Sequence, residues 1–249
     1  DDAVLLSEAD ALLVGSEFAE AGLAVASAGD VDGDGLADLL VGGPTARTEG
    51  NSYDGAVWLV QGPITGQHAL DDVCSAHIQG GVDYFLGGAV SGMGDVDGDG
   101  LDDVMVGAPG HHPYETLIGQ AMLFTTLVGE VTANDATATI TGNQYQDYTG
   151  YTLAPAGDLD ADGYADMLIG ASYLVDERSV RLGGLFVFHG PLEGEFALDD
   201  AQASLLGDDS AVCLGADAGS TDLDGDGTLD LVVSSRLSLD PAGSASVLF

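Results

Sequence analysis

The chain has 249 residues, and 45% of them are hydrophobic, enough for a buried core in one large domain or two small ones. Its 42 acidic residues outnumber 4 basic ones, which gives a formal net charge of −38. Nucleic acids and anionic membranes require a basic surface, so neither is expected as a partner. No apolar run is long enough for direct membrane insertion, and the 38 glycines favour short strands and tight turns.

The first strand-like pattern covers residues 8–15, where polar and apolar residues partly alternate. A segment rich in Gly and Ala follows at 23–28, and its small side chains suit close packing near a crowded axis. After an aspartate-rich loop at 30–38, an apolar run at 39–42 predicts a strand buried on both faces. The remaining predicted strands of this unit are a third strand at 55–60 and an outer strand at 72–80.

The same unit recurs three times along the chain. Its aspartate-rich loops begin at Asp30, Asp95, Asp158 and Asp222, so the spacings are 65, 63 and 64 residues. A fixed period of this size indicates repeated supersecondary units. The later strands are predicted at 88–93, 104–107, 119–124 and 135–142, then at 151–156, 167–170, 184–188 and 200–207, and finally at 214–219, 231–234 and 243–249. The units cover approximately 16–80, 81–142, 143–207, and 208–249 together with 1–15.

Four four-stranded sheets around an axis form a β-propeller, so the sequence predicts an all-β fold with a single propeller domain over residues 1–249. The chain starts with an outer strand and stops after a third strand. We therefore expect the N-terminal strand to complete the last blade and close a four-bladed ring. Two alternatives agree equally well with a chain that starts and stops at these strands of the repeat. In one, the four blades are part of a seven- or eight-bladed ring; in the other, two copies of the chain pair into one ring.

Each aspartate-rich loop, here called an acidic loop, has aspartates at positions 1, 3, 5 and 9 and glycine at position 6. Calcium takes about six to eight oxygen ligands, which alternate side chains and one backbone carbonyl of a short loop can supply. The glycine permits the positive φ that folds the backbone around the ion. We predict four Ca²⁺ sites. The expected ligands are the side chains of Asp30, Asp32, Asp34, Asp38, Asp95, Asp97, Asp99, Asp103, Asp158, Asp160, Asp162, Asp166, Asp222, Asp224, Asp226 and Asp230, and the main-chain oxygens of Leu36, Leu101, Tyr164 and Thr228.

Two other interpretations of these loops fail on chemistry. An EF-hand requires a glutamate at position 12 and flanking helices, whereas position 12 here is a valine or isoleucine inside an apolar strand. Asp-Gly is common in ordinary hairpin turns, but such turns do not need four acids in nine residues. Like charges this close repel unless a cation compensates them, so the ions are expected mainly to hold each blade together.

The repeats resemble the FG-GAP repeats of the integrin alpha-subunit propeller and its bacterial relatives. The elements that carry the resemblance are a GAP motif at Val106-Gly107-Ala108-Pro109 with variants at 41–44 and 169–172, and FG motifs at Leu86-Gly87 and Leu214-Gly215 with looser forms at 21–22 and 149–150. The fourth repeat departs most, because Val-Ser-Ser-Arg stands at 233–236. The resemblance implies an adhesion module whose partner binds the face opposite the acidic loops.

That opposite face is formed by the loops between second and third strands, at 43–54, 108–118, 171–182 and 235–242, together with the loops between each outer strand and the first strand of the next unit. The loops between second and third strands are the longest irregular stretches on it. They contain all four arginines and several aromatic residues, which is the composition of a recognition surface. In the alternative, each arginine pairs with a nearby acid and orders its own loop. The candidate partner-binding residues are Arg47, Tyr53, His111, Tyr114, Tyr173, Arg178, Arg181 and Arg236.

The favoured function is a non-catalytic, calcium-binding adhesion or protein-interaction module outside the cell or on its surface, as a monomer or homodimer. No nucleophile elbow, zinc motif or phosphate loop suggests an enzyme. A carbohydrate-binding or accessory domain of a secreted polysaccharide-acting enzyme is one alternative, so the ligand is a protein or a glycan. A purely structural repeat of a surface protein is another. The chain begins at Asp1 without a signal peptide, as in a mature or excised segment.

The cysteines and histidines carry weaker signals. Cys74 and Cys213 lie on different kinds of strand and do not form a disulfide framework, so both are expected as free, mostly buried thiols. His68, His77 and His189 lie near or within predicted outer strands, and packing or solvent contact is the role expected for them.

Overall fold

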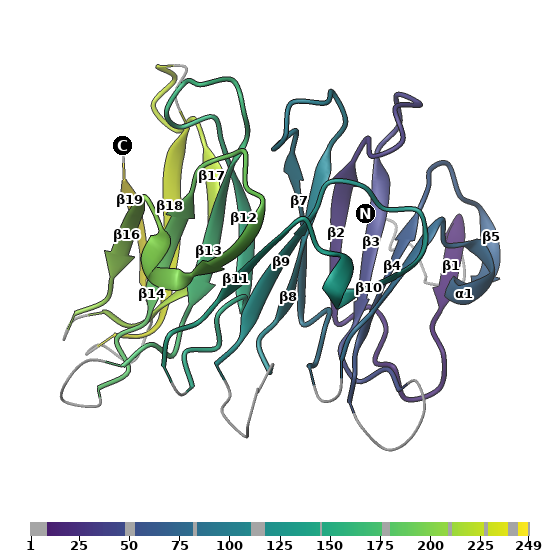
Figure 1. Cartoon of the computed structure of the whole chain (residues 1–249), viewed down its shortest axis with the longest axis horizontal. Helices are drawn as coiled ribbons and strands as arrows, with labels where there is room; N and C mark the ends of the chain where they lie inside the picture. Colours follow the sequence, from purple (N-terminus) through teal and green to yellow (C-terminus); the bar gives the residue numbers. More distant parts are fainter. Residues whose placement is uncertain are drawn as a thin grey trace, which may run out of the picture.

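A computed structural model of the chain describes residues 9–47, 53–81, 84–110, 118–144, 146–175, 180–208, 211–226, 229–238 and 244–248. Four sheets stand side by side and form an open arc, and a two-stranded parallel sheet lies at the N-terminal end of the arc (Figure 1). The main strands of the four sheets are antiparallel, and the first two sheets each carry one more strand, which pairs in parallel and comes from the next repeat. None of the helices in the described part of the chain has the length and apolar character needed to cross a membrane. The molecule is all-β apart from single helical turns, and it forms part of a β-propeller.

The sheets follow the predicted repeats. The first contains β2 (Ala24–Gly29), β3 (Asp38–Gly43), β4 (Ala56–Val60) and β6 (Ala76–Gln79), and the second contains β7 (Ala89–Gly94), β8 (Asp103–Ala108), β9 (Gln120–Phe124) and β11 (Ala138–Thr141). The third contains β12 (Thr152–Gly157), β13 (Asp166–Ala171), β14 (Gly184–Phe188) and β16 (Ala203–Leu206), and the last contains β17 (Ala211–Thr221), β18 (Asp230–Ser238) and β19 (Ser244–Leu248).

A short strand and a helical turn precede each of the outer strands β6, β11 and β16, and the sequence pattern missed both. They are β5 (Gly66–Ala69) with α1 (Leu70–Val73), β10 (Gly129–Thr132) with the 3₁₀ turn Ala133–Asp135, and β15 (Gly194–Ala197) with the 3₁₀ turn Leu198–Asp200. In the second repeat the Asp135 carboxylate accepts hydrogen bonds from the backbone N–H (2.8 Å) and hydroxyl (2.7 Å) of Thr132. This cap favours a helical turn over a continuous strand.

The prediction that the N-terminal strand completes the last blade is wrong. Strand β1 (Ala11–Val14) pairs in parallel with β5, while β19 at the other end of the arc pairs with β18 (Figure 1). The physical reason is the packing of successive sheets, which spreads them along an arc and separates the first from the last. An open arc agrees with the alternatives in which the four blades form part of a larger ring. The repeat boundaries stay a prediction.

The core lies between neighbouring sheets. Leu40 and Val57 of the first sheet pack with Val104 of the second, and Leu168 of the third packs with Val233 of the last. Both faces of the second strands β8 and β13 are thus covered, as their unbroken apolar runs predict.

Close backbone contacts explain the motif glycines. The Gly87 N–H donates to the Gly107 carbonyl at 2.9 Å within one sheet. A Cβ atom at Gly107 would lie 2.1 Å from the Gly150 carbonyl oxygen of the next sheet. The GAP glycine therefore sits between two FG glycines, where no side chain fits.

Candidate metal loops and partner-binding face

The acidic loops bring their carboxylates together at one end of the sheets. In each of the first three loops, oxygens of the aspartates at positions 1, 3 and 5 lie within 4.8 Å of one another. In the last loop the same is true of Asp222, Asp224 and Asp230. Gly227 and Thr228 of that loop lie outside the described residues.

Backbone N–H groups hold these carboxylates in place. The Asp30 carboxylate accepts from the N–H groups of Gly33 (2.9 Å) and Gly35 (3.0 Å), and the Asp34 carboxylate accepts from Leu36 N–H at 2.8 Å. The same pattern recurs at Asp95, whose oxygens accept from Gly98 and Gly100. Position 6 has a positive φ of 85° to 98° in the first three loops, as its glycine predicts.

The position-9 aspartates are buried beneath the loops, and one of them is incompletely paired. Asp38 and Asp166 each accept a second backbone hydrogen bond, from Gly62 at 3.0 Å and from Gly190 at 3.1 Å. Asp103 is 1% exposed, and its Oδ2 accepts from Val96 N–H at 2.7 Å, but Oδ1 has no hydrogen-bond partner. An orphaned buried carboxylate oxygen beside other carboxylates fits a bound cation.

Burial raises the pKa of the Asp103 carboxyl to about 7, and the charges of Asp97 and Asp99 raise it further against the opposing effect of the Val96 N–H. The pKa values of Asp38 and Asp166 are also raised, again mainly by burial. The donors are all hard oxygens, so the chemistry of these residues fits Ca²⁺. The ligand assignments, including the carbonyls at position 7, remain predictions.

The third loop contains one strained residue. Ala161 at position 4 has φ 61°, whereas Gly33, Gly98 and Gly225 occupy that position elsewhere. A left-handed conformation costs a non-glycine residue about 1–2 kcal/mol. We expect Ala161→Gly to raise the free energy of unfolding by about 1 kcal/mol, measured by urea denaturation. Ala165→Gly in the same loop is a control without a positive φ to relieve, so an equal gain there would contradict the explanation.

Two residues after the third strands reach into the loops, which the sequence did not suggest. His189 Nδ1 lies 2.8 Å from Asp160 Oδ2, and Gln61 Nε2 donates to Asp32 Oδ2. The packing or solvent role expected for His189 was therefore wrong. The signal was its place directly before a Gly-Pro turn, which Gln61 shares.

The opposite end of the sheets brings arginine and aromatic side chains together. The Arg47 guanidinium carbon lies 4.8 Å from the Tyr53 ring centre, and that of Arg181 lies 5.1 Å from the Tyr173 ring centre. Arg236 donates to the Tyr151 hydroxyl at 2.9 Å, from the end of β18 rather than from a loop. Cation–π contacts of this kind are within the usual limit of about 6 Å. The other candidates, His111, Tyr114 and Arg178, lie outside the described residues.

A cavity of about 640 Å³ lies on this face, and the sequence missed most of its lining. Three of the lining residues precede the FG positions of successive repeats and have left-handed φ values: Glu20 (50°), Phe85 (53°) and Tyr148 (53°). The sequence signal that could have identified them is their shared position, directly before the FG element in three successive repeats. The full lining consists of Glu20, Leu23, Pro44, Thr45, Phe85, Gly88, Pro109, Gly110, Tyr148 and Tyr151.

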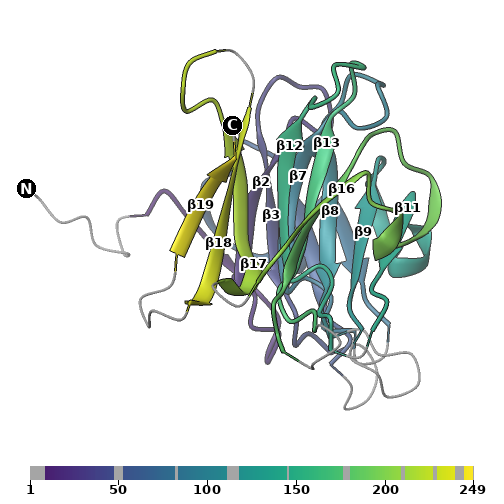
Figure 2. The same ribbon diagram turned by 90° about the vertical axis from the view of Figure 1, so that its left-hand side faces the viewer.

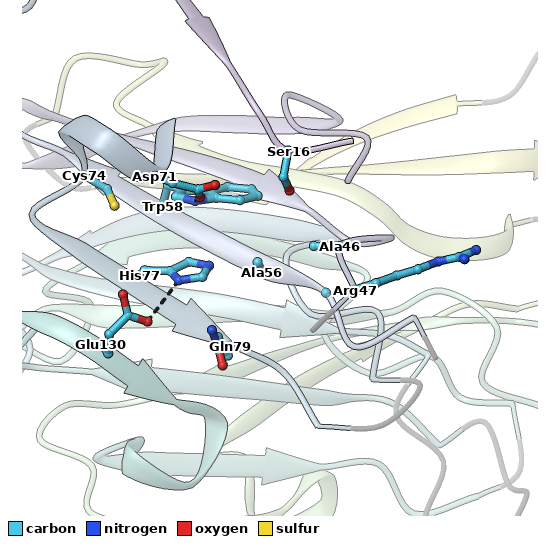
Figure 3. A pocket seen from close by; sticks show the side chains of 11 residues that line it. Ser16, Ala46, Arg47, Ala56, Trp58, Asp71, Cys74, His77, Gln79 and Glu130 are labelled. Atoms are coloured by element: carbon cyan, nitrogen blue, oxygen red, sulfur yellow. Dashed lines mark hydrogen bonds and ion pairs between the residues drawn. The ribbon is translucent and has the colours of Figure 1, made fainter. Parts of the chain in front are cut away.

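A second cavity, of about 660 Å³, lies against the first sheet (Figure 3). The Trp58 indole N–H donates to Asp71 at 2.7 Å, the Trp58 and His77 rings stack at 5.4 Å, and His77 Nδ1 lies 3.1 Å from Glu130. Cys74 also lines this cavity, but burial and then the charges of Asp71 and Glu130 raise the pKa of its thiol. A nucleophilic cysteine needs the opposite shift. Both cysteines are free, as predicted.

An open propeller arc of repeated blades, with an acidic loop at one end of each sheet, defines the class of this protein. Comparison with known proteins names the repeat: the FG-GAP repeat model matches residues 21–60, 87–116 and 149–180. The chain is thus an FG-GAP repeat propeller that resembles the propellers of integrin alpha subunits.

Three integrin relatives illustrate the resemblance. Integrin alpha pat-2 of Caenorhabditis briggsae is 31% identical over 237 residues, which cover 88% of this chain and 18% of that protein. Human integrin alpha-X is 30% identical over 85% of this chain and 19% of its own length. Integrin alpha-4 of Xenopus laevis is 32% identical over 67% of this chain and 15% of its own length. The chain spans less than a fifth of each relative.

Proposed function

We propose that this chain is a non-catalytic, calcium-stabilised interaction module of adhesion type, acting outside the cell or on its surface. The observation that carries the proposal is the separation of two sites at opposite ends of the sheets. Clustered carboxylates lie at one end. At the other end lie the arginine–tyrosine pairs and a cavity that is lined in part by Tyr151, the partner of Arg236. Calcium then supports the fold, while the opposite face binds the partner.

The calcium part of the proposal rests on charge and on the pairing of Asp103. Three carboxylates within 4.8 Å repel one another, and the buried Asp103 Oδ1 has no donor. A divalent ion in each loop would offset the repulsion between its carboxylates, and in the second loop it would also provide a partner for Asp103 Oδ1. Four ions would change the formal charge from −38 to about −30. Millimolar calcium outside cells would fill such sites without high affinity.

The partner-binding part rests on composition and backbone strain. Arg47, Arg181 and Arg236 stack on or bond to tyrosines on one face of a very acidic protein. Left-handed non-glycine residues such as Phe85 and Tyr148 are costly, and strain of this kind gathers at ligand-binding sites. We infer a protein ligand that places acidic and apolar groups on this face.

A glycan ligand is the second candidate, because sugar rings also stack on exposed tyrosines such as Tyr53, which is 38% exposed. Paired arrays of extracellular proteins and of glycans, probed with the labelled chain in millimolar calcium, distinguish a protein ligand from a glycan ligand. We expect saturable binding to a protein ligand. Binding to one sugar class alone would favour the lectin alternative, and no binding on either array would favour a purely structural repeat.

Replacing Arg47, Arg178, Arg181 and Arg236 by alanine should reduce that binding at least tenfold, because four positive charges and the ring contacts of Arg47 and Arg181 are lost together. Replacement by lysine keeps the charge but not the planar stacking, so only partial recovery is expected. Titration on the immobilised ligand provides the measurement. The calcium-dependent melting temperature is the folding control and should not change. Undiminished binding by the alanine variant would place the recognition surface elsewhere.

A further inference from the structure

The acidic loops of neighbouring sheets stand in a row and contact one another. Figure 1 and Figure 2 both show them at the upper end of the sheets, as the turns that join β2 to β3, β7 to β8, β12 to β13 and β17 to β18. We number them loop 1 to loop 4 in chain order, and position 1 is the first aspartate of each loop. The contacts described next join sheets within the chain and involve neither edge of the arc.

A backbone hydrogen bond joins loop 2 to loop 1 and loop 3 to loop 2. The Asp102 N–H, at position 8 of loop 2, donates to the Asp30 carbonyl, at position 1 of loop 1, at 3.1 Å. The Ala165 N–H, at position 8 of loop 3, donates to the Asp95 carbonyl of loop 2 at 2.9 Å. Position 1 supplies the first predicted ligand of a loop, and position 8 directly follows the carbonyl predicted as a ligand at position 7. Each bond therefore connects the ligand backbones of two neighbouring loops.

Side-chain packing reinforces the same two junctions. The Tyr164 ring, at position 7 of loop 3, lies over Gly98 of loop 2, where an added Cβ atom would be 2.6 Å from Tyr164 Cε1. Leu101, at position 7 of loop 2, lies over Gly33 of loop 1, where an added Cβ atom would be 3.1 Å from Leu101 Cδ2. The glycine at position 4 thus leaves room for a side chain of the next loop.

Asp102 adds a side-chain bond at the first junction. Position 8 is alanine in loops 1 and 3 and leucine in loop 4, so only loop 2 has an acid there. The Asp102 carboxylate accepts a hydrogen bond from the Asp30 N–H at 2.8 Å, so these two residues exchange two hydrogen bonds. Asp102 is not at one of the predicted ligand positions. It is a positioning residue that holds the backbone of a predicted ligand in the neighbouring loop.

We propose that neighbouring acidic loops bind Ca²⁺ cooperatively, because positions 7 and 8 of each loop hold the first ligand of the loop before it. This inference rests on the calcium part of the proposed function. When the position-7 carbonyl of loop 2 is held by an ion, the peptide between Leu101 and Asp102 is fixed, and with it the Asp30 backbone of loop 1. The next ion then meets a loop that is already partly ordered and pays less conformational entropy.

Charge repulsion between loops and ions acts in the opposite direction. Each loop has four predicted carboxylate ligands, so one divalent ion changes its formal charge from −4 to −2. An occupied loop therefore attracts a second ion through space less strongly than an empty loop does. Salt at about 0.15 M screens exposed charges beyond about 8 Å, whereas hydrogen bonds and packing between touching loops persist. At that salt concentration we expect the contacts to outweigh the loss of attraction.

Hydrogen exchange measured by mass spectrometry during a calcium titration tests the coupling, because it gives a separate calcium midpoint for each loop. The titration starts from the metal-free chain at low temperature, where circular dichroism checks that it is folded, so that the midpoints report loop ordering. Replacing Asp97 and Asp99 by alanine removes two predicted ligands of loop 2 and leaves it with the formal charge of an occupied loop. We expect the midpoints of loops 1 and 3 to rise at least about fivefold. By reciprocity, Asp32→Ala with Asp34→Ala should raise the midpoint of loop 2.

Variants of the contact residues keep every predicted side-chain ligand and separate coupling from binding. In isothermal titration, Tyr164→Ala and Asp102→Ala should each leave the number of sites unchanged and lower the Hill coefficient toward one. Tyr164→Phe keeps the ring and Asp102→Asn keeps an acceptor oxygen, so both should retain the cooperativity of the unmodified chain. Leu36→Ala is the matched control and should also retain it, because Leu36 occupies position 7 of loop 1 but is 46% exposed.

Three results would contradict the inference in distinguishable ways. Unchanged midpoints for loops 1 and 3 after the loop 2 substitutions would overturn the cooperativity and leave calcium binding intact. An equal loss of cooperativity in Tyr164→Phe and Tyr164→Ala would overturn the role assigned to ring packing. If no loop gains protection in millimolar calcium, the calcium part of the proposed function fails, and the inference fails with it.

Discussion

Removing calcium is expected to lower the melting temperature of this chain by roughly 20–40 °C. An ion that binds only the folded state stabilises it by about 2.7 kcal/mol per site at a hundredfold excess over the dissociation constant. At this chain length 1 kcal/mol corresponds to roughly 2–4 °C, so four filled loops account for the range. Calorimetry with and without EGTA measures the difference, and isothermal titration with CaCl₂ gives the number of sites.

The controls separate chelation from other effects of EGTA. EGTA saturated with calcium should leave the melting curve unchanged, and excess calcium added to the chelated chain should restore it. The number of sites provides a second check, because a count near one would indicate that only the loop with the unpaired Asp103 oxygen fills. An unchanged melting curve on chelation would contradict the metal assignment altogether.

The second large effect is expected from Asp103→Asn, with opposite signs in the two metal states. Without calcium, the folded state binds a proton at Asp103 up to pH about 7, while an unfolded aspartate loses it near 3.8. The stability of the metal-free chain should therefore fall as pH rises from about 4 to 7, by up to about 1.4 kcal/mol per unit. The neutral amide would remove this loss, so the metal-free variant should be more stable at pH 8 by a few kcal/mol.

In calcium the same substitution should be destabilising, because one carboxylate ligand is lost and the bound ion no longer offsets the remaining charges. Urea denaturation at pH 5 and pH 8 gives the four free energies of unfolding, with calcium or after calcium has been removed with EGTA at pH 8 and the chain dialysed into calcium-free buffer. Asp38→Asn is the matched control. Its second oxygen already accepts from Gly62, so a smaller gain is expected in the metal-free state. A loss of stability in EGTA at pH 8 would contradict the account of Asp103.

Much of this protein could be predicted from local sequence signals. The Gly- and Ala-rich inner segments, the apolar runs at 39–42 and its counterparts, and the 63–65-residue period predict the strands of each sheet. The spacing of the aspartates predicts which carboxylates meet, because a nine-residue loop can bring alternate side chains to one point. Because these signals lie within one repeat, they can be recognised in the sequence without knowledge of the tertiary structure.

Contacts between repeats were harder to predict from the sequence. The period alone does not give the curvature of the arc, so it could not decide that β1 pairs with β5 rather than with β19. The second hydrogen bonds to Asp38 and Asp166 come from residues 24 positions further on, after the third strand. The cavity lining around Phe85 and Tyr148 likewise depends on three neighbouring sheets.

The sequence by itself thus determined the propeller blades and the acidic loops, because strand pattern and loop chemistry depend on near neighbours along the chain. Only the tertiary structure decided which aspartate lacks a donor, which tyrosines stack with Arg47 and Arg181, and which edges stay open. Each of these depends on how one sheet packs against the next, and that packing is set by the fit of side chains far apart in sequence.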